Sequence, residues 1–448
     1  MYSIFMARTD HSVFAGSGSP AAAPAALRGR GAVTNVRHRF QRDDRSAVDP
    51  ADEPALADPE FVAPVHGAAR LAADTVRFAV PIYPAAAADG SRRAEPADPA
   101  AASDPSHPAE LPDPSETTSL ATTVAVEQAR KLLSRNDSPD VPFDRAINTY
   151  RGCEHGCAYC YARPTHAYLG YSPGLDFETR LIAKANAVDA LRAELARPGY
   201  RVEPINIGSA TDVYQPIERS WRLTRGVIEV LLETGHPLTI VTKNALIERD
   251  LDLLQALARR RLVAVYISIT SLDAGLSRAL EPRASAPWKR LQAVRKLADA
   301  GIPVGVLAAP IIPFINDEFL ERIVDEAAQA GAYYASYTVV RLPWEVRPVF
   351  EQWLQAHFPD RAERVLHRIE DLREGKRNDP RFGSRMRGTG IWADLLRQRF
   401  DRAVRKAGLN RHRLQLDTQQ FIPPAPFASS GAGFAHGPAP ARQLGLFD

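Results

Sequence analysis

Short apolar runs and longer amphipathic stretches alternate between about residues 145 and 345 of this chain. In the longer stretches apolar residues recur every three or four positions, which predicts helices. The short runs are rich in Val, Ile, Tyr and Thr, which predicts strands. Gly235, Gly301 and Gly331 each follow a predicted helix, as expected where a helix ends in a left-handed residue. The predicted strands are 146–150, 205–209, 238–242, 263–268, 304–308 and 333–338, and the predicted helices between them are 184–196, 224–234, 250–260, 288–300 and 318–330.

This order of elements indicates parallel β/α units, because strands that alternate with helices of ten or more residues pair in parallel. Right-handed crossovers curve such a sheet toward a barrel, and six units leave the barrel open on one side. The predicted fold is therefore α/β, a partial (β/α)6 barrel. Its chemistry is expected at the carboxyl ends of the strands.

Composition divides the rest of the chain. Residues 1–120 are rich in Ala, Pro, Asp and Ser and bury too little apolar surface to offset the entropy of ordering, so we expect a disordered tract. Its basic stretches, 27–35 and 37–40, either stay solvated or dock on the folded body. We assign 121–345 to the β/α core, 346–421 to a basic helical C-terminal extension and 422–448 to a flexible tail.

Charge gathers in one part of the chain. The net formal charge is only +3, yet residues 361–413 hold 16 Lys and Arg against 7 Asp and Glu. A dense basic face suits a phosphate-rich partner such as nucleic acid, and the alternative is a helical surface whose charges pair locally. The sequence shows no run of 18 apolar residues and no secretory signal, and three reduced cysteines fit a cytoplasmic protein.

All three cysteines, Cys153, Cys157 and Cys160, lie in one window with the spacing C-x3-C-x2-C. Three thiolates can hold three irons of a [4Fe–4S] cluster and leave the fourth iron open for a small molecule, whereas an electron-transfer cluster takes four protein ligands. The alternative is a structural zinc site with His155 or His166 as the fourth ligand. The odd count disfavours a disulfide framework.

Polar residues follow the later strands, where side chains of successive units meet at one edge of a parallel sheet. Each one alone has an alternative role as a helix cap or loop anchor, but the set predicts a ligand site. An arginine in the sequence Glu-Pro-Arg, Arg283, suits bidentate pairing with a carboxylate. The other candidates are Thr211 and Asp212 after the second strand, Lys243 and Asn244 after the third, and Ser268 and Thr270 at the end of the fourth.

Together these motifs resemble those of the radical S-adenosylmethionine (SAM) superfamily, and in particular its spore photoproduct lyase-like branch, also described as DNA-repair photolyase-like. The resemblance covers about residues 120–410 and rests on 148–164, 211–218, 242–243 and 281–283. It implies a [4Fe–4S] cluster on the three cysteines, with SAM on the open iron. It also implies that Thr211 and Asp212 contact the amino end of SAM, and that Lys243 and Ser268 contact its ribose or carboxylate. Arg283 is our candidate for the SAM carboxylate.

The resemblance further implies a reaction. An electron from a flavodoxin- or ferredoxin-type donor cleaves SAM to a 5′-deoxyadenosyl radical, which abstracts hydrogen from a substrate. The lyase carries a further cysteine, a hydrogen-atom donor, where this chain has Ala210. Because no thiol remains for that role, Tyr159, Tyr161 and Tyr214 are the candidate donors.

Three functions stay open from these residues. The first is radical SAM chemistry on DNA or another nucleic acid, and the second is the same chemistry on a peptide or small molecule. The third is a DNA-tethered iron–sulfur or zinc protein without SAM chemistry. The segment Gln443-Leu444-Gly445-Leu446-Phe447 resembles the peptide by which bacterial DNA polymerases and repair factors dock on the sliding clamp. Its alternative is an apolar plug that packs on this protein's own barrel.

Overall fold

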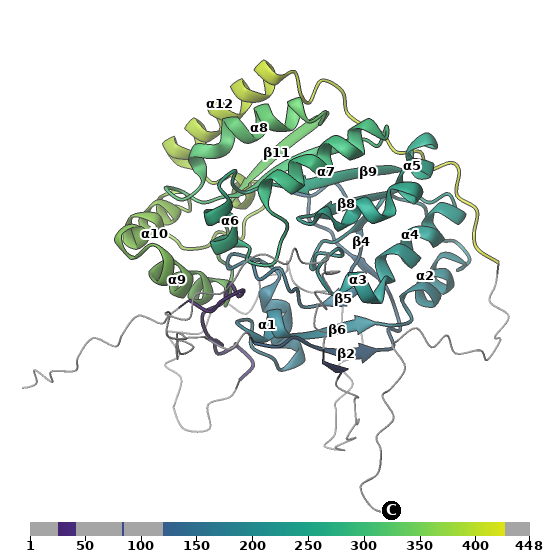
Figure 1. The fold of residues 1–448 in the computed structure, drawn as a ribbon, viewed down its shortest axis with the longest axis horizontal. Helices are drawn as coiled ribbons and strands as arrows, with labels where there is room; N and C mark the ends of the chain where they lie inside the picture. The colour runs from purple at the N-terminus through teal and green to yellow at the C-terminus, as the bar shows by residue number, and fades with distance from the viewer. Residues whose placement is uncertain (1–25, 42–82, 85–119, 426–448) are drawn as a thin grey trace, which may run out of the picture.

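A computed structural model describes residues 26–41, 83–84 and 120–425 of the chain (Figure 1). Its centre is a seven-stranded sheet in the order β11-β10-β9-β8-β7-β4-β3. All neighbours in this sheet run parallel except β3, which is antiparallel to β4. The strands are β3 (Leu133–Arg135), β4 (Arg145–Ile147), β7 (Ile205–Ile207), β8 (Leu238–Thr242), β9 (Val263–Ser268), β10 (Val304–Ile311) and β11 (Tyr334–Val339).

The six parallel strands lie where the apolar runs predict them. The predicted ranges 238–242 and 263–268 coincide with β8 and β9, whereas β10 continues beyond residue 308 to Ile311. The first predicted strand is divided, because β4 ends at Ile147 and β5 (Tyr150–Arg151) joins a different sheet. The α/β class and the parallel order are confirmed, and closure into a partial (β/α)6 barrel stays a prediction.

Helices pack against one face of this sheet, and their apolar residues join those of the strands in the main core. Figure 1 shows α2, α4, α5, α7 and α8 along that face, with α12 beside α8. Each fully buried Leu, Ile or Val in this layer contributes about 1.5–3 kcal/mol. The helices of this layer are α2 (Ala187–Leu195), α4 (Leu223–Glu233), α5 (Leu251–Arg259), α7 (Pro287–Asp299) and α8 (Leu320–Gln329). The short helices α3 (Glu218–Trp221) and α6 (Ala274–Leu280) pack in other apolar clusters.

A second, four-stranded sheet lies beside the first, in the order β1-β2-β6-β5. It consists of β1 (Tyr83–Pro84), β2 (Thr123–Glu127), β6 (Arg180–Lys184) and β5. The sequence pattern did not predict it, and the helix expected at 184–196 begins only at Ala187, after β6. Between β5 and β6 lie the cysteines, the 3-10 helix η3 (Arg163–Leu169) and α1 (Asp176–Thr179).

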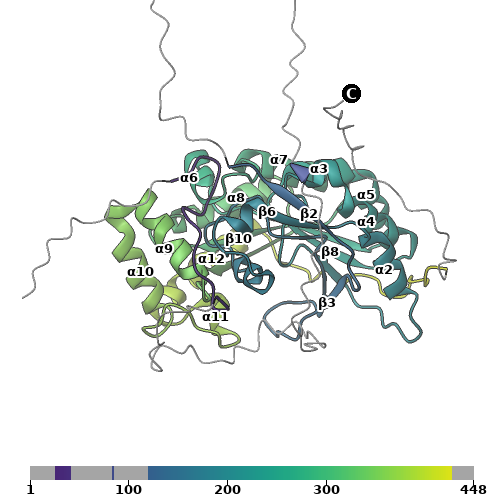
Figure 2. The same cartoon turned by 90° about the horizontal axis from the view of Figure 1, so that it is seen from below.

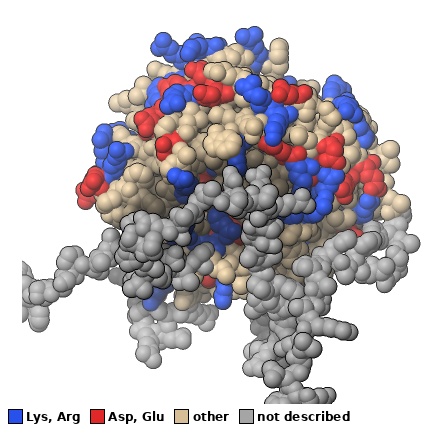
Figure 3. Space-filling model, in the orientation of Figure 1, with Lys and Arg blue, Asp and Glu red and all other residues tan. Residues whose placement is uncertain are grey.

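In the described part of the chain, β11 is followed by the α-helices α9 (Val346–His357), α10 (Ala362–Asp371), α11 (Ser384–Arg387) and α12 (Gly390–Ala407). Many arginines of the basic stretch 361–413 are paired with carboxylates. Arg377 binds Glu351 and Glu370, and Arg399 binds Glu321 through both side-chain oxygens. Figure 3 shows basic and acidic side chains interspersed on the visible face. Local pairing therefore accounts for a large part of this charge excess.

Residues 26–41, here called the strap, differ from the expected disorder of 1–120. The strap lies alongside α9 and the segment after the cysteines (Figure 2). Ala32, Val33 and Val36 are buried in it. The basic stretches thus dock on the folded body. Apart from β1 and Leu120, the rest of 1–120 lies outside the described residues, as does the clamp-like segment 443–447. In the part of the chain that the structure describes, no helix is long and apolar enough to cross a membrane.

The hairpin between β3 and β4 contacts α11, which packs on β11 at the opposite edge of the main sheet. The carboxylate of Asp140 accepts a hydrogen bond from the Gly383 amide (2.7 Å) and binds the Arg385 guanidinium, which also binds Ser138. The Arg385 and Asp140 side chains are only 1% and 8% exposed. This buried ion pair connects the two edges of the sheet.

Replacing Asp140 with Ala removes the buried carboxylate that binds the Gly383 amide and the Arg385 guanidinium, so we expect unfolding to become easier by about 3 kcal/mol. Denaturant titration measures the change. Asp137→Ala is the matched control, because Asp137 is an exposed carboxylate on the same hairpin. Equal free energies of unfolding for the two variants would show that the pair does not connect the edges.

Candidate functional site

The three cysteines lie in the loop (152–162, the cysteine loop) that follows β4 and β5 at the carboxyl end of the first parallel strand. Cys153 and Cys157 are buried, Cys160 is partly buried, and none forms a disulfide. Gly152 and Gly156 adopt φ values of +76° and +68°, which favour glycine. The loop therefore holds three unlinked thiols in a conformation that its glycines permit.

Asp212, just beyond β7, connects this loop to two strand ends. Its carboxylate accepts hydrogen bonds from the Thr242 hydroxyl (2.7 Å) and the amides of Lys243 (2.7 Å) and Tyr214 (2.9 Å). The same carboxylate lies 3.3 Å from Nδ1 of His155, inside the cysteine loop. Burial acts to raise the pKa of Asp212, but His155 and these hydrogen bonds outweigh it and hold the pKa well below its usual range.

His155 is held on both ring nitrogens, since its Nε2 lies 3.2 Å from Nδ2 of Asn244 at the end of β8. Gln215 adds a second connection. Its side chain accepts from the Glu154 amide (2.9 Å) and donates to the Gly152 carbonyl (3.2 Å). The cysteine loop is therefore positioned by residues that follow β7 and β8.

Lys243 brings a positive charge to the cysteines. Burial acts to lower the pKa of Lys243, but the charges of Cys157 and Glu281 outweigh it, and the pKa is raised. Its ammonium lies 5.9 Å from the centre of the Tyr159 ring and, among the described residues, makes no direct hydrogen bond or ion pair. Burial raises the pKa of Cys157 to about 12, and Lys243 opposes that rise. This ammonium is thus available to an anionic ligand.

Glu281 is a buried carboxylate that interacts electrostatically with Lys243. It accepts hydrogen bonds from Tyr159 and from Thr270 (3.0 Å), and it forms a fully buried ion pair with Arg290. Burial acts to raise the pKa of Glu281, whereas Arg290 and Lys243 lower it, and the net shift is downward. Both oxygens of the Glu281 carboxylate are bonded, so Glu281 holds the Tyr159 side chain, and with it this part of the cysteine loop, in place.

The donor set fits an iron–sulfur cluster. Three thiols in one loop, with a cation beside two of them, can supply thiolates, which are the ligands such clusters use. The zinc alternative needs His155 or His166 as a fourth ligand. His155 is engaged on both ring nitrogens, and Nε2 of His166 lies 2.9 Å from the Arg180 carbonyl. Within the described ranges, no group of three His, Cys, Asp or Glu side chains is arranged to hold a single metal ion.

Other predicted residues lie close to the cysteine loop but in different settings. Thr211 is buried, its hydroxyl 3.4 Å from the Tyr150 carbonyl, and Ser268 is buried at the end of β9. Arg283 forms an ion pair with Glu154 (2.9 Å) and donates to Thr122 (3.2 Å). The guanidinium that we assigned to the SAM carboxylate is therefore already paired within the protein.

The three candidate tyrosines are not equivalent. Tyr159 is buried and bound to Glu281, and Tyr214 is fully buried in the main core. Tyr161 is 47% exposed, and its hydroxyl donates to the Ser209 carbonyl just before Ala210. Of the three, only Tyr161 combines exposure with a place beside the second strand end.

One residue that supports the site escaped the sequence analysis. Asn148 follows β4, and its side-chain oxygen accepts from the amides of Ala210 (2.8 Å) and Thr211 (3.1 Å). Its side-chain amide donates to Ser209 (3.1 Å). Its position after the first strand, equivalent to that of the later candidates, is the signal that could have identified it.

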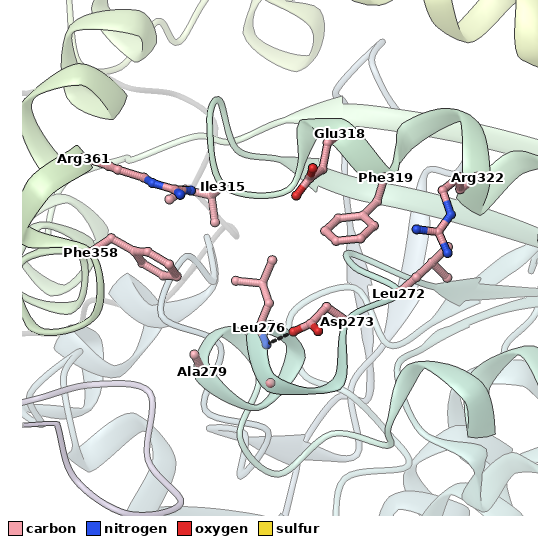
Figure 4. Close-up of a pocket in the computed structure, with 11 residues that line it drawn as sticks. Leu272, Asp273, Leu276, Ala279, Ile315, Glu318, Phe319, Arg322, Phe358 and Arg361 are labelled. Carbon is pink, nitrogen blue, oxygen red and sulfur yellow. Dashed lines mark hydrogen bonds between the residues drawn. The ribbon is translucent and has the colours of Figure 1, made fainter.

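A cavity of about 580 Å³ lies near the carboxyl ends of β9 and β10. Figure 4 shows Arg361 and Arg322 on opposite sides of it, with Leu276 and Phe319 between them. Its other lining residues include Phe358 from the segment after α9. The carboxylates of Asp273 and Glu318 line the same cavity, so its two arginines are balanced by two acidic residues.

Comparisons with known proteins agree with the geometry. The family model of the Radical SAM superfamily matches residues 147–327. An uncharacterized protein of Mycobacterium tuberculosis (strain ATCC 25618 / H37Rv) is 38% identical over 226 residues, which are 50% of this chain and 66% of that protein. An uncharacterized protein of Methanocaldococcus jannaschii is 26% identical over 242 residues, 54% of this chain and 86% of that protein. This chain thus spans slightly less than two thirds of its mycobacterial relative.

Solved structures include spore photoproduct lyase complexed with dinucleoside spore photoproduct. It is 20% identical, with a TM-score of 0.44, and the match covers 63% of this chain and 78% of the lyase chain. The superfamily expected from the cysteine spacing is confirmed by the family model. Residues 147–327, which include the cysteine loop and the strands β7 to β10, match this model and form a radical SAM domain.

Proposed function

We propose that this protein is a radical SAM enzyme whose [4Fe–4S] cluster is held by Cys153, Cys157 and Cys160. The observation that carries the proposal is the cysteine loop itself, three unlinked thiols beside the Lys243 ammonium at the carboxyl end of a parallel sheet. These cysteines would hold the cluster, which would supply the electron for splitting SAM into methionine and a 5′-deoxyadenosyl radical. The protein's residues bind SAM, orient it and exclude water.

The roles of the SAM-binding candidates differ. Lys243 is the residue for the SAM carboxylate, because its ammonium has no competing direct partner among the described residues, whereas Arg283 is paired with Glu154. Thr211, in the loop after β7, and Ser268, at the end of β9, stay our candidates for the amino and ribose groups. Asp212 already accepts three hydrogen bonds and contacts His155. Its main role is to position the cysteine loop, and any contact with SAM adds to that.

We assign the hydrogen-atom donor, if the reaction uses one, to Tyr161. Its phenol is on the exposed side of the cysteine loop, and the neighbouring strand end carries Ala210 rather than a thiol. Tyr159 and Tyr214 are both enclosed by the protein.

A nucleic-acid substrate is favoured by a group of arginines at the same edge of the sheet. Phe314 follows β10, and the guanidinium carbons of Arg364 and Arg368 lie 4.0 and 5.5 Å from the centre of its ring. Arg361 donates to the Phe314 carbonyl (3.3 Å) and lines the cavity opposite Arg322. Cations clustered on an aromatic ring suit phosphates and bases. A peptide or small anionic substrate is the alternative.

Two partner proposals rest on sequence alone. A flavodoxin- or ferredoxin-type protein would reduce the cluster. The segment Gln443-Leu444-Gly445-Leu446-Phe447 would dock on the sliding clamp and bring the enzyme to DNA.

Anaerobically reconstituted protein, supplied with SAM and dithionite, should release 5′-deoxyadenosine, detected by mass spectrometry. Ala at Cys153, Cys157 or Cys160 should abolish the product, because each removes a thiolate ligand. Lys243→Met should reduce product formation mainly by weakening SAM binding, since it keeps the side-chain length without the charge. Product formed by a cysteine variant would contradict the ligand assignment.

Single-stranded DNA binding should depend on the arginines around Phe314. We expect Arg361→Ala, Arg364→Ala and Arg368→Ala each to weaken binding. The slope of the logarithm of the binding constant against the logarithm of the salt concentration should become shallower by about one for each phosphate that is no longer neutralised. Fluorescence anisotropy with a labelled oligonucleotide at several salt concentrations measures both effects. Arg402→Ala is the matched control, an exposed arginine on α12. An equal loss of affinity in all four variants would point to general charge rather than to this cluster.

A further inference from the structure

The strap lies directly against the cysteine loop. A side-chain carbon built on Gly31 would lie 1.5 Å from the carbonyl oxygen of Gly156 and 3.2 Å from the Ala158 amide nitrogen. Gly156 lies between Cys153 and Cys157 in sequence. Only a glycine allows the strap backbone to approach the loop this closely.

Glu178, at the end of α1, connects the strap to a cysteine. Its carboxylate accepts hydrogen bonds from the amides of Gly31 (3.1 Å) and Ala32 (2.8 Å) and forms a fully buried ion pair with Arg163. Arg163 in turn donates to the carbonyl of Cys157 (2.9 Å). A buried carboxylate is costly unless its oxygens are satisfied, so the two strap amides are part of what keeps this ion pair in place.

Arg30 provides a second connection. It is 5% exposed and donates to the Glu178 carbonyl (2.9 Å) and the Thr122 hydroxyl (3.0 Å). Thr122 also accepts from Arg283, whose ion pair with Glu154 reaches the cysteine loop.

The other end of the strap is anchored on the helices that follow the β/α core. Arg39 forms an ion pair with Glu345 (2.8 Å) just before α9, and Thr34 donates to Gln352 on α9 (2.7 Å). Ala32 and Val36 pack with Val349 in a small apolar cluster. The strap is thus fixed at both ends and lies across the loop between them.

We propose that the strap is part of the cluster site: it positions the cysteine loop through Gly31, Glu178 and Arg163, and it covers the backbone between Cys153 and Cys157 from solvent. This inference rests on the proposed cluster. It gives a role in the site to a segment whose composition predicts a disordered tail, and it makes the lifetime of the cluster in air depend on residues more than 100 positions before the first cysteine.

Two truncated chains test the proposal, one beginning at residue 26 and one at residue 42, so that they differ only by the strap. Both are reconstituted anaerobically, analysed for iron and sulfide and then exposed to air while the cluster absorbance is followed. We expect the chain without the strap to lose its cluster about tenfold faster, a size typical of changes around metal ligands. Equal decay rates in the two chains overturn the proposal.

Point variants keep the test valid if the shorter chain does not fold. Gly31→Val places a side chain against the Gly156 carbonyl, whereas Asn35→Ala removes the strap's two exposed hydrogen bonds to Asp176 (3.2 and 3.0 Å). We expect faster cluster loss in Gly31→Val and a rate close to that of the unaltered protein in Asn35→Ala. Circular dichroism confirms that both are folded. Equal rates in the two variants count against the proposal.

The measurement uses no SAM, so it separates this inference from the proposed function. If the lifetime of the cluster depends on the strap but the protein never cleaves SAM, the proposed role of the strap is supported and the proposed enzymatic function is contradicted. If the protein cleaves SAM but the lifetime of its cluster does not depend on the strap, the enzymatic function is supported and the role of the strap is contradicted.

Discussion

The carboxylate of Asp212 is the contact on which the arrangement of the site depends. It joins the ends of β7 and β8 to His155 in the cysteine loop through four polar neighbours. A parallel sheet brings its strand ends to one edge, but it does not by itself orient a loop that leaves the first strand. This carboxylate does so, because its buried charge is stable only while all these donors converge on it.

The loop is held from the opposite side by a second buried carboxylate, that of Glu178, which joins the strap and Arg163 to the Cys157 carbonyl. The two carboxylates thus hold the cysteine loop through His155 and through the Cys157 carbonyl. Such an arrangement suits the proposed function, in which the site holds a cluster and SAM in one geometry.

Much of the fold could be predicted from periodicity, because the strands β7 to β11 are short apolar runs that are each followed by a helix. The cysteines were recognisable from their spacing. The partner of Arg283 was not, since Glu154 and Arg283 are 129 positions apart and only the folded loop brings them together. Docking of the strap was only one of two alternatives from the sequence, for a related reason. Its 16 residues lie in an Ala- and Pro-rich tract, and their order depends on contacts such as Gly31 with Gly156, which composition does not encode.

The most direct test of the account is electron paramagnetic resonance of the reduced, reconstituted protein before and after SAM is added. If Cys153, Cys157 and Cys160 hold three irons and leave the fourth open, SAM will chelate that iron and change the spectrum of the cluster. The change should be weaker in Lys243→Met at the same SAM concentration. An intact cluster whose spectrum is unaffected by saturating SAM would contradict the central claim that this site binds SAM at an open iron.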